Sequence, residues 1–580
     1  MASTVANGET AKAKLHGRAF YESIGSPKFV LAPMVDQSEF AWRMLSRSFL
    51  TPTENAKLLA YTPMLHARLY EETAKYRESH FEATRPLKST PSGSAPSPTP
   101  ASSNAEEPSS PTPFLDGNPA IDRPLFVQFC ANDPEHLLGA AKLVAPYCDA
   151  VDLNLGCPQG IARRGHYGAF LQEDQELVYN LINTLHKNLP VPVTAKIRIL
   201  DTKEDTLAYA KNVLAAGASI ITVHGRRREQ KGHITGVADW QFLRYLRENL
   251  PKETVIFANG NILQHGDLEQ CLEATGADAV MSAEGNLSDP AIFAQPPSPG
   301  QEGREYWRGK DGKGGYRIDA VFRRYMDIIH KYVLQHEPPT RRPLFVTGDD
   351  ESWLAESKKK DAEEEEGPAR KKRKKDGGGK HEKCTSPNLV AIRPHLFHLL
   401  RHFISRHTDI RDALARCHAG DVPAIEKVLD MVERRVAEGL IEYERTEGKS
   451  VEEPESEPQS KAEDSKASTE PPKTEDVEYD PESSVATVKK CKRPWWIAQP
   501  IVRPLPKEAL ANGSISLSKK EKKKQGQGSK ASEVDGNKTS KKENGTVEDE
   551  LPKTDTATGI KEPTMDTKRP TATTDELVSG

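Results

Sequence analysis

The feature that most constrains this chain is a strand–helix rhythm that repeats eight times between residues 28 and 283. Each repeat begins with a short apolar run, rich in β-branched residues, and continues through turn residues into a helical pattern, as at 134–147 and 203–217. The apolar residues do not alternate with polar ones, which is typical of strands buried on both faces of a parallel sheet. The runs are 28-KFVLA-32, 57-KLLAY-61, 124-PLFVQF-129, 149-DAVDLNL-155, 191-VPVTAKIRI-199, 219-SIITVH-224, 254-TVIFAN-259 and 278-DAVMSA-283.

Eight such units in succession predict an α/β chain that closes into a (β/α)8 TIM barrel. An open, doubly wound sheet is the alternative architecture. We expect the barrel over residues 25–297, after a disordered N-terminus at 1–24. A Pro- and Ser-rich stretch over 85–120 interrupts the rhythm and cannot bury enough apolar surface to fold. It predicts a disordered insertion in a surface connection, with a regulatory phosphorylation loop as the alternative.

Helical patterns follow the barrel at 316–333, 388–407 and 421–440. They predict a small helical domain over 315–445, split by a disordered insertion of basic and acidic residues at 356–384. From residue 446 to 580 the chain is mostly low-complexity and is expected to be disordered. The exception is 494-PWWIAQPIVRPLP-506, because paired tryptophans are costly to leave in water. We expect this segment to dock on the folded body; a partner-binding peptide is the alternative.

Charge and cysteine content narrow the function classes. The net charge of −4 is spread unevenly, so it does not exclude a nucleic-acid partner. Seven cysteines form no CxxC pair, which argues against a disulfide framework or a metal site and favours a reducing compartment. The N-terminus lacks a secretory signal and no apolar run is long enough to cross a membrane. We therefore expect a soluble cytoplasmic or nuclear protein, the latter because 370-RKKRKK-375 resembles a nuclear localisation signal.

Polar residues and glycines gather where the predicted strands end. In this barrel class the reactive groups lie at the C-terminal strand ends and on the loops that follow. A buried Lys or Gln needs a polar partner, and a ligand rich in acceptor atoms would supply one. The sequence therefore predicts a ligand site at one rim, formed by 32-APMV-35, Gln128, 154-NLGCPQ-159, Lys196, Arg198, 224-HGR-226, 259-NGN-261 and 283-AEGN-286.

Three features of this rim favour a flavin. Gly260 and Gly285 would let backbone N–H groups approach a phosphate closely. Lys196 could hold a positive charge near a flavin N1–C2=O group, which gains electron density on reduction. Gln128 can both donate and accept, which suits the edge of a pyrimidine-like ring. Another phosphorylated metabolite is the alternative ligand.

Cys157 stands apart from the other cysteines because it follows Gly156 and precedes Pro158 on the loop after the fourth strand. A thiol at a catalytic rim can act as a nucleophile or as an acid, and a thiol is mostly protonated at neutral pH. The alternative is a small buried apolar residue. Basic residues near the same rim indicate a polyanionic partner such as RNA. They are Arg163, Arg164, His166, Arg226, Arg227, Arg228 and Lys231, with Arg393, His395, His398, Arg401, His402 and Arg406 in the helical region.

Taken together, these motifs resemble the tRNA-dihydrouridine synthase family, and are most similar to its eukaryotic subgroup for positions 16 and 17. The matching segments are 32-APMVDQSEFAWR-43, 61-YTPMLHA-67, 127-VQFCAND-133, 152-DLNLGCPQGIARRGHYGAFL-171, 196-KIRI-199, 223-VHGRRREQKG-232, 259-NGNI-262 and 283-AEGN-286. The resemblance implies FMN as cofactor, NADPH or NADH as reductant, tRNA as substrate and Cys157 as proton donor. It implies FMN contacts from Pro33, Met34, Val35, Gln128, Lys196, His224, Asn259, Gly260, Asn261, Glu284 and Gly285.

The resemblance also implies a reaction: uridine in the D-loop is reduced to 5,6-dihydrouridine, with hydride passing from flavin N5 to C6 and a proton from Cys157 to C5. Asn154 and Arg198 are candidates to hold the uracil carbonyls, and Arg163, Arg164 and Arg226 are candidate RNA contacts. A flavoenzyme that acts on a free base, of the dihydropyrimidine or dihydroorotate dehydrogenase type, is one alternative. A non-catalytic RNA-binding protein is the other.

Overall fold

The structure is a computed structural model that describes residues 14–85, 112–355, 384–451 and 484–511. The eight predicted strands form a closed parallel barrel, which confirms the TIM-barrel prediction. The barrel closes because β1 pairs with both β2 and β9, and β2 pairs in turn with β4. A short extra strand, β3 (Leu65–His66), pairs with the end of β4. The barrel strands are β1 (Phe29–Leu31), β2 (Leu58–Tyr61), β4 (Leu125–Cys130), β5 (Ala150–Leu155), β6 (Val193–Arg198), β7 (Ile220–His224), β8 (Val255–Asn259) and β9 (Ala279–Ser282).

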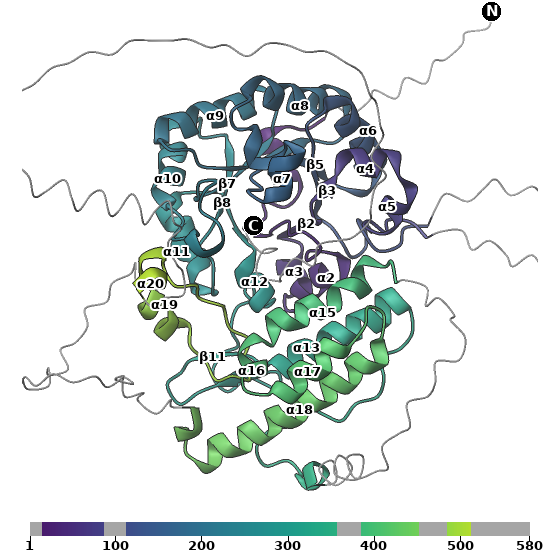
Figure 1. Cartoon of the computed structure of the whole chain (residues 1–580), viewed down its shortest axis with the longest axis vertical. Coiled ribbons are helices and arrows are strands. Elements are labelled where there is room, and N and C mark those ends of the chain that lie inside the picture. Colours follow the sequence, from purple (N-terminus) through teal and green to yellow (C-terminus); the bar gives the residue numbers. More distant parts are fainter. Residues whose placement is uncertain (1–13, 86–111, 356–383, 452–483, 512–580) are drawn as a thin grey trace, which may run out of the picture.

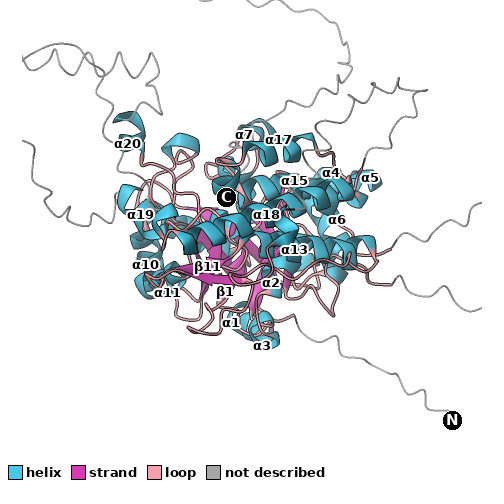
Figure 2. Cartoon of the chain, turned by 90° about the horizontal axis from the view of Figure 1, so that it is seen from below, coloured by secondary structure: helices cyan, strands magenta, loops and turns pink. Residues whose placement is uncertain are grey.

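Helices surround the strands on all sides, as Figures 1 and 2 show. Side-chain caps begin several of them: Asp133 accepts from Glu135 N and His136 N at α6, and Thr202 accepts from Asp205 N at α9. No helix within the described ranges is long and apolar enough to span a bilayer. The barrel helices are α2 (Phe40–Ser48), α3 (Pro52–Asn55), α4 (Ala67–Glu72), α5 (Ala74–Glu78), α6 (Pro134–Val144), α7 (Gly160–Gly165), α8 (Gln175–Asn188), α9 (Lys203–Ala215), α10 (Trp240–Asn249), α11 (Gly266–Thr275) and α12 (Glu284–Ser288).

The predicted disordered N-terminus is wrong for its last part, because residues 17–23 form helix α1 (Gly17–Ser23). The aromatic rings of Phe20 and Tyr21 are buried, and Phe20 stacks on Phe126 at the start of β4 with ring centroids 5.9 Å apart. Tyr21 also donates to the carbonyl of Asp278, just before β9. The N-terminal segment therefore covers the end of the barrel opposite the predicted site.

The insertion predicted at 85–120 is also shorter than expected on its C-terminal side. Leu115 is buried, and Asp116 accepts from Arg43 Nη2 of α2 at 2.7 Å. Arg43 is fully buried and also pairs with Asp122 at 2.5 Å, so this segment supplies charges that a buried guanidinium requires. Residues 86–111 of the insertion, residues 356–383 of the second insertion, and most of the predicted disordered tail lie outside the described residues.

A helical region packs on one side of the barrel. Figure 1 shows it below the barrel, beside α2 and α12. Trp42 of α2 stacks on His395 of α15 with centroids 3.8 Å apart and planes 2° apart, and His395 Nε2 lies 2.9 Å from Glu39 Oε2. This buried seam ties the two regions together. The helices of the region are α13 (Ile318–Ile328), its π-helical continuation η4 (Ile329–Leu334), α15 (Pro387–Leu399), α16 (Arg401–Ile404), α17 (Thr408–Arg416) and α18 (Val422–Arg445).

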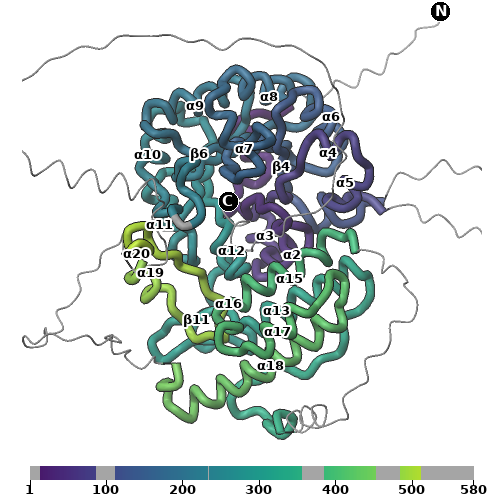
Figure 3. The backbone as a smooth tube through the Cα atoms, in the orientation of Figure 1, coloured from purple at the N-terminus to yellow at the C-terminus, as the bar shows by residue number. Residues whose placement is uncertain are grey.

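The C-terminal segment, residues 484–511, bridges the two regions and contains α19 (Ser484–Cys491) and α20 (Pro506–Ala511). Figure 3 shows it running from beside β11 (Gly314–Tyr316) towards α11. Trp496 is 1% exposed and lies between Trp307 and Tyr443, with centroids 5.8 and 6.0 Å away. Further along, Arg503 pairs with Glu284 of α12. The ordered part of the tail is therefore longer than the predicted docking segment at 494–506.

Candidate active site at the barrel rim

A chain of hydrogen bonds links the ends of β4, β5 and β6 inside the barrel. The Gln128 side chain is fully buried, donates to Asp152 Oδ2 and accepts from Asn154 Nδ2, both at 2.8 Å. Asp152 also accepts from the Thr194 hydroxyl at 2.6 Å, and burial raises the pKa of this carboxyl to about 6. These bonds fix the orientation of the Gln128 amide at the rim.

The same chain ends at Cys157. The Asn154 side-chain oxygen accepts from the backbone N–H groups of Gly156 at 3.1 Å and Cys157 at 2.9 Å. Gly168, at φ +65°, packs so closely that a Cβ there would lie 2.8 Å from the Cys157 carbonyl oxygen. Protein contacts therefore hold the loop that carries the thiol from two sides.

Cys157 is partly exposed, unlike Cys130, Cys148, Cys271, Cys417 and Cys491, which are buried. Burial raises the pKa of the Cys157 thiol. A backbone hydrogen bond and the charges of Arg198, Lys196 and Lys231 oppose that shift. The net effect keeps Sγ protonated at neutral pH. A protonated thiol can donate a proton but is a poor nucleophile, so the electrostatics favour the acid role.

Lys196 of β6 is buried, and Nζ donates to Asn259 Oδ1 of β8 at 3.1 Å. Asn259 in turn donates to the Met281 carbonyl of β9 at 3.0 Å. Burial, and then the charge of Arg198, lower the pKa of Lys196 to about 7, although the charges of Asp152 and Cys157 oppose the shift. No described carboxylate lies within ion-pair distance of Nζ. An ammonium that is buried without a direct ion pair is costly, so this position fits a ligand that brings or develops negative charge.

His224, at the end of β7, is left with an unused donor. Its Nε2 accepts from Arg226 Nη1 at 3.0 Å, so the ring proton resides on Nδ1. Burial, followed by the charges of Arg198, Lys196 and Arg226, lowers the pKa of His224 well below its usual value, which keeps the ring neutral. Nδ1 is buried without a partner among the described residues. A buried N–H without an acceptor is the second indication that a ligand with acceptor oxygens belongs here.

Arg226 and Asn261 join the loops after β7 and β8. Arg226 Nη2 donates to Asn261 Oδ1 at 2.9 Å, and Arg226 Nε donates to the Gly236 carbonyl at 3.2 Å. Asn261 has left-handed backbone geometry with φ 63° and makes two further bonds to the backbone of Ala238. Arg226, which the sequence placed among candidate RNA contacts, therefore has three of its N–H groups bonded within the rim.

Gly260 and Gly285, the glycines predicted to approach a phosphate, both pack closely against protein atoms. A Cβ on Gly260, where φ is +113°, would lie 2.6 Å from Ala238 Cβ and 3.1 Å from His224 Cδ2. A Cβ on Gly285 would lie 2.2 Å from the Ile262 carbonyl oxygen. Glu284, beside it, is paired with Arg503 at 2.8 Å. The rim loops after β8 and β9 are thus packed tightly, and the phosphate role of these residues remains a prediction.

The loop after β1 completes the rim. Pro33 and Met34 are buried and Val35 is partly exposed. The Ser38 hydroxyl accepts from the Met34 backbone N–H at 3.0 Å, which holds the turn. These three residues stand at the same end of the barrel as Gln128, Lys196 and His224, because all of them follow or end parallel strands.

Asn154 and Arg198, the predicted uracil contacts, both shape the loop of Cys157. Arg198 is 1% exposed, and its Nε donates to the Gly156 carbonyl at 2.7 Å while Nη1 donates to the Arg227 carbonyl at 3.1 Å. Asn154 bonds Gln128, Gly156 and Cys157 as described above. Both side chains lie next to the thiol, and their bonds to substrate remain predictions.

The predicted basic surface contains exposed side chains, side chains in ion pairs and one buried histidine. Arg163 and Arg164 of α7 are exposed and form no ion pair with described residues, and Figure 1 shows α7 in front of the barrel strands. Arg227 pairs with Asp201 at 3.2 Å and Arg228 pairs with Glu173 at 2.5 Å. The prediction was wrong for His395, which is fully buried in the seam with Trp42. Arg393, Arg401, His402 and Arg406 of the helical region are exposed.

Sequence reasoning missed three residues that support the site. Asp152 orients Gln128, Thr194 bonds Asp152, and Arg503 pairs with Glu284. Asp152 had a visible signal, since an acid within an apolar strand, two residues before Asn154, must face the same side of that strand. Arg503 had none, because the contact spans 219 residues. Within the four described ranges, no group of three or more His, Cys, Asp and Glu side chains could hold a metal ion.

Comparison with known proteins adds a family relationship. The family model described as "Dihydrouridine synthase (Dus)" matches residues 30–306. The tRNA-dihydrouridine(16/17) synthase [NAD(P)(+)] of Saccharomyces cerevisiae is 45% identical over 406 residues, covering 70% of this chain and 73% of the yeast protein. The Schizosaccharomyces pombe protein of the same name is 39% identical, covering 85% of this chain and 92% of its own. A human tRNA-dihydrouridine(20a/20b) synthase-like protein is 33% identical, covering 46% of this chain and 70% of its own.

Proposed function

Since the chain belongs to the dihydrouridine synthase family, we propose that it reduces uridine to 5,6-dihydrouridine in tRNA, with FMN as its flavin and NADPH or NADH as reductant. The observation that carries this proposal is the combination at one rim of a protonated thiol, an uncompensated lysine and a neutral histidine with an unused N–H. A free-base reductase would share the flavin and the thiol but would not need the exposed Arg163 and Arg164 beside them.

The rim fits a flavin on chemical grounds. Lys196 supplies the positive charge that a reduced isoalloxazine ring requires, and His224 Nδ1 supplies a donor for an oxygen of the cofactor. Gln128 presents an amide that Asp152 and Asn154 hold in one orientation. The residues that would hold FMN are Pro33, Met34, Val35, Gln128, Lys196, His224, Asn259, Gly260, Asn261, Glu284 and Gly285.

When bound, the flavin supplies the hydride that reaches C6 of the uracil ring. Cys157 Sγ supplies the proton at C5, so one hydride and one proton saturate the C5–C6 bond. The target uridine must leave its stack to reach a rim inside a barrel mouth. Asn154 and Arg198, beside the thiol, hold the uracil carbonyls, and the positive charge of Arg198 favours the enolate that develops at C4=O.

Exposed basic side chains would bind the RNA backbone. Arg163 and Arg164 lie beside the thiol loop, and Arg393, Arg401 and Arg406 extend the basic surface onto the helical region. We place the reduced uridines at positions 16 and 17 of the D-loop, because the yeast proteins of that name match more closely than the human 20a/20b protein. A cytoplasmic or nuclear location is part of the same proposal; the basic run at 370–375 lies outside the described residues.

The test has two arms. Purified flavin-loaded protein receives NADPH with either unmodified tRNA or free uridine, and dihydrouridine is quantified by mass spectrometry. Dihydrouridine in tRNA alone supports the proposal, whereas turnover of free uridine alone, or flavin reduction without product, rejects it. Mapping tRNA from cells that lack the protein then assigns the positions: loss of dihydrouridine at sites other than 16 and 17 would contradict the assignment.

A further inference from the structure

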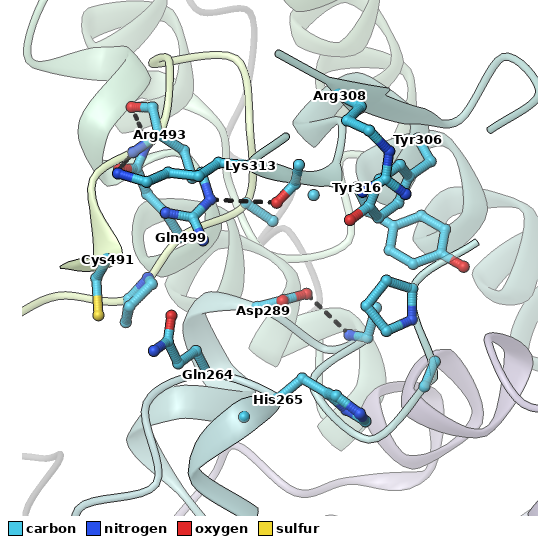
Figure 4. Close-up of a pocket in the computed structure, with 18 of the residues that line it drawn as sticks. Gln264, His265, Asp289, Tyr306, Arg308, Lys313, Tyr316, Cys491, Arg493 and Gln499 are labelled. Atoms are coloured by element: carbon cyan, nitrogen blue, oxygen red, sulfur yellow. Dashed lines mark hydrogen bonds between the residues drawn. The ribbon is translucent and has the colours of Figure 1, made fainter. Parts of the chain in front are cut away.

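A second cavity lies outside the rim, with a volume of about 380 Å³, and shares no residue with the proposed flavin site. Four segments enclose it: the loop between β8 and α11, the stretch that follows α12, the hairpin of β10 (Tyr306–Arg308) and β11, and the C-terminal segment. Figure 4 shows the side chains that line it. Regular elements adjoin three of these segments: α11 follows the first, β10 and β11 form the hairpin, and α19 lies within the C-terminal segment. The cavity therefore forms where segments distant in sequence pack together.

Asp289 provides the acid of this cavity. One of its carboxyl oxygens accepts from the Ala291 backbone N–H at 3.0 Å, and the carboxyl forms no ion pair with described residues. Burial raises the pKa of Asp289 to about 7, while the bond from Ala291 and the charge of Arg493 oppose the shift. The carboxyl therefore has acceptor positions that the protein leaves unused.

Arg493, Tyr306 and Tyr316 lie close enough to this carboxyl to interact with its charge, and Lys313 lines the same cavity. Arg493 is held by bonds from Nε to the Gly314 carbonyl at 3.2 Å and from Nη1 to the Lys490 carbonyl at 3.0 Å. Lys313 is exposed at the glycine-rich turn, and its ammonium makes no hydrogen bond to the described part of the chain. Tyr306 and Tyr316 meet edge to face with centroids 5.3 Å apart, and they give the cavity an apolar wall.

Gln264 adds an adaptable polar group near Asp289, as Figure 4 shows. Its side-chain amide is not hydrogen-bonded to any described residue. An acid near an amide, in a cavity that is also lined by cations and aromatic rings, matches a nucleobase recognised on its edge. Guanine is the base that offers two adjacent donors, N1–H and N2–H, to one carboxylate, and its O6 and N7 accept from Lys or Arg.

We propose that this cavity binds a single guanine nucleotide, with the base edge on Asp289 and the phosphate towards Lys313 and Arg493. The nucleotide comes either from the free pool or from an unstacked residue of an RNA, since both present the same chemistry. The proposal does not depend on the reaction at the rim.

The proposal has a defined pH dependence. Guanine donates to the ionised carboxyl, so its affinity rises as pH increases from 6 to 8 through the pKa of Asp289. Adenine would need the protonated carboxyl as a donor to N1, so its affinity would fall over the same range. The other titratable and charged groups that line the cavity with Asp289 are His265, Tyr306, Tyr316, Arg308, Lys313 and Arg493.

The first experiment titrates full-length, flavin-loaded protein with GMP and with AMP by calorimetry at pH 6 and pH 8. We expect GMP to bind about tenfold more tightly than AMP at pH 8, the discrimination of one good bidentate pair. Asp289→Asn removes that preference, whereas Glu269→Gln, an exposed acid on neighbouring α11, leaves it intact. Equal affinity for GMP and AMP, absence of GMP binding, or an unchanged preference in Asp289→Asn overturns the proposal.

The second experiment identifies the source of the nucleotide. If tRNA displaces GMP, and Asp289→Asn raises the KM for tRNA with kcat unchanged, the guanine belongs to the RNA. If GMP and tRNA bind together, the free nucleotide is the ligand. A protein that forms dihydrouridine normally but binds no GMP refutes the second cavity and leaves the proposed function standing.

Discussion

The barrel rim and the helical region differ in whether their buried charged side chains form ion pairs. At the rim, among the described residues, Lys196 forms no ion pair with a carboxylate and the His224 Nδ1–H has no acceptor. In the helical region, charged side chains of α13 and of the loop after η4 pair with acids of α18: Arg323 with Glu433 at 2.7 Å, and Arg341 with Glu426 at 2.8 Å. Where the fold needs only stability, charges are neutralised within the protein. Where polar groups are left without such partners, the site fits a ligand that would supply them.

The largest effect that we expect from a substitution at the rim is the loss of product formation when the Cys157 thiol is removed. Cys157→Ala removes the proposed proton donor but none of the flavin contacts, so FMN stays bound while product formation falls by about 10²–10⁴-fold. Single-turnover assays with prereduced enzyme and tRNA measure this step directly. Cys148→Ala is the matched control, because Cys148 is buried before β5 and its thiol donates to the Ala145 carbonyl, its one hydrogen bond to described residues. Equal rates for the two variants would remove Cys157 from the reaction.

The helical ion pairs should behave as structural groups. Arg323→Met removes the short ion pair and leaves Glu433 only the longer contact with Arg342 at 3.7 Å, which costs about 2 kcal/mol of unfolding free energy. Arg323→Met combined with Glu433→Leu removes both charges and recovers most of that loss. Urea denaturation followed by circular dichroism measures both variants. If the single variant lost flavin or substrate affinity without losing stability, the assignment of these pairs to structure would be wrong.

In the flavin-free protein, buried Lys196 should lower the free energy of unfolding, in contrast to the stabilising ion pairs of the helical region. The pKa of Lys196 is lowered to about 7 in the fold, so the unfolded chain binds more protons than the native state above that pH. Its contribution to stability therefore rises with pH, by about 1.5 kcal/mol between pH 7 and 8.5. Lys196→Met abolishes this increment, which is measured as the difference in unfolding free energy between wild type and variant at the two pH values. A difference that stays constant with pH would contradict the predicted shift.

The barrel was predictable from sequence because its signal is local. Each strand is an uninterrupted apolar run, and the rule that sites lie at C-terminal strand ends places Gln128, Lys196 and His224 together from the sequence alone. Structures that depend on distant partners were missed. Helix α1 is ordered because Phe20 meets Phe126, and residues 112–120 are ordered partly because Asp116 meets Arg43. Composition alone assigns both segments to disorder.

In the candidate site, too, local sequence signals were predictable and contacts between distant residues were not. Spacing identified Cys157 and the polar strand ends, but not which of their bonds the protein itself uses. His395 was expected on a basic surface and is buried against Trp42, because a histidine among Leu and Phe gives no sign of which face it occupies. Likewise, Arg226 and Arg198 are basic in sequence, yet their bonds to Asn261 and Gly156 depend on how the rim loops meet.

The central claim is that the uncompensated groups of the rim form a flavin site. The most direct measurement titrates flavin-free protein with FMN and follows the quenching of flavin fluorescence. We expect one FMN per chain, with affinity lost in Lys196→Met and in His224→Leu but kept in the Arg323→Met and Glu433→Leu double variant. Failure of the wild-type protein to take up FMN, or equal uptake by all of these variants, would contradict the account.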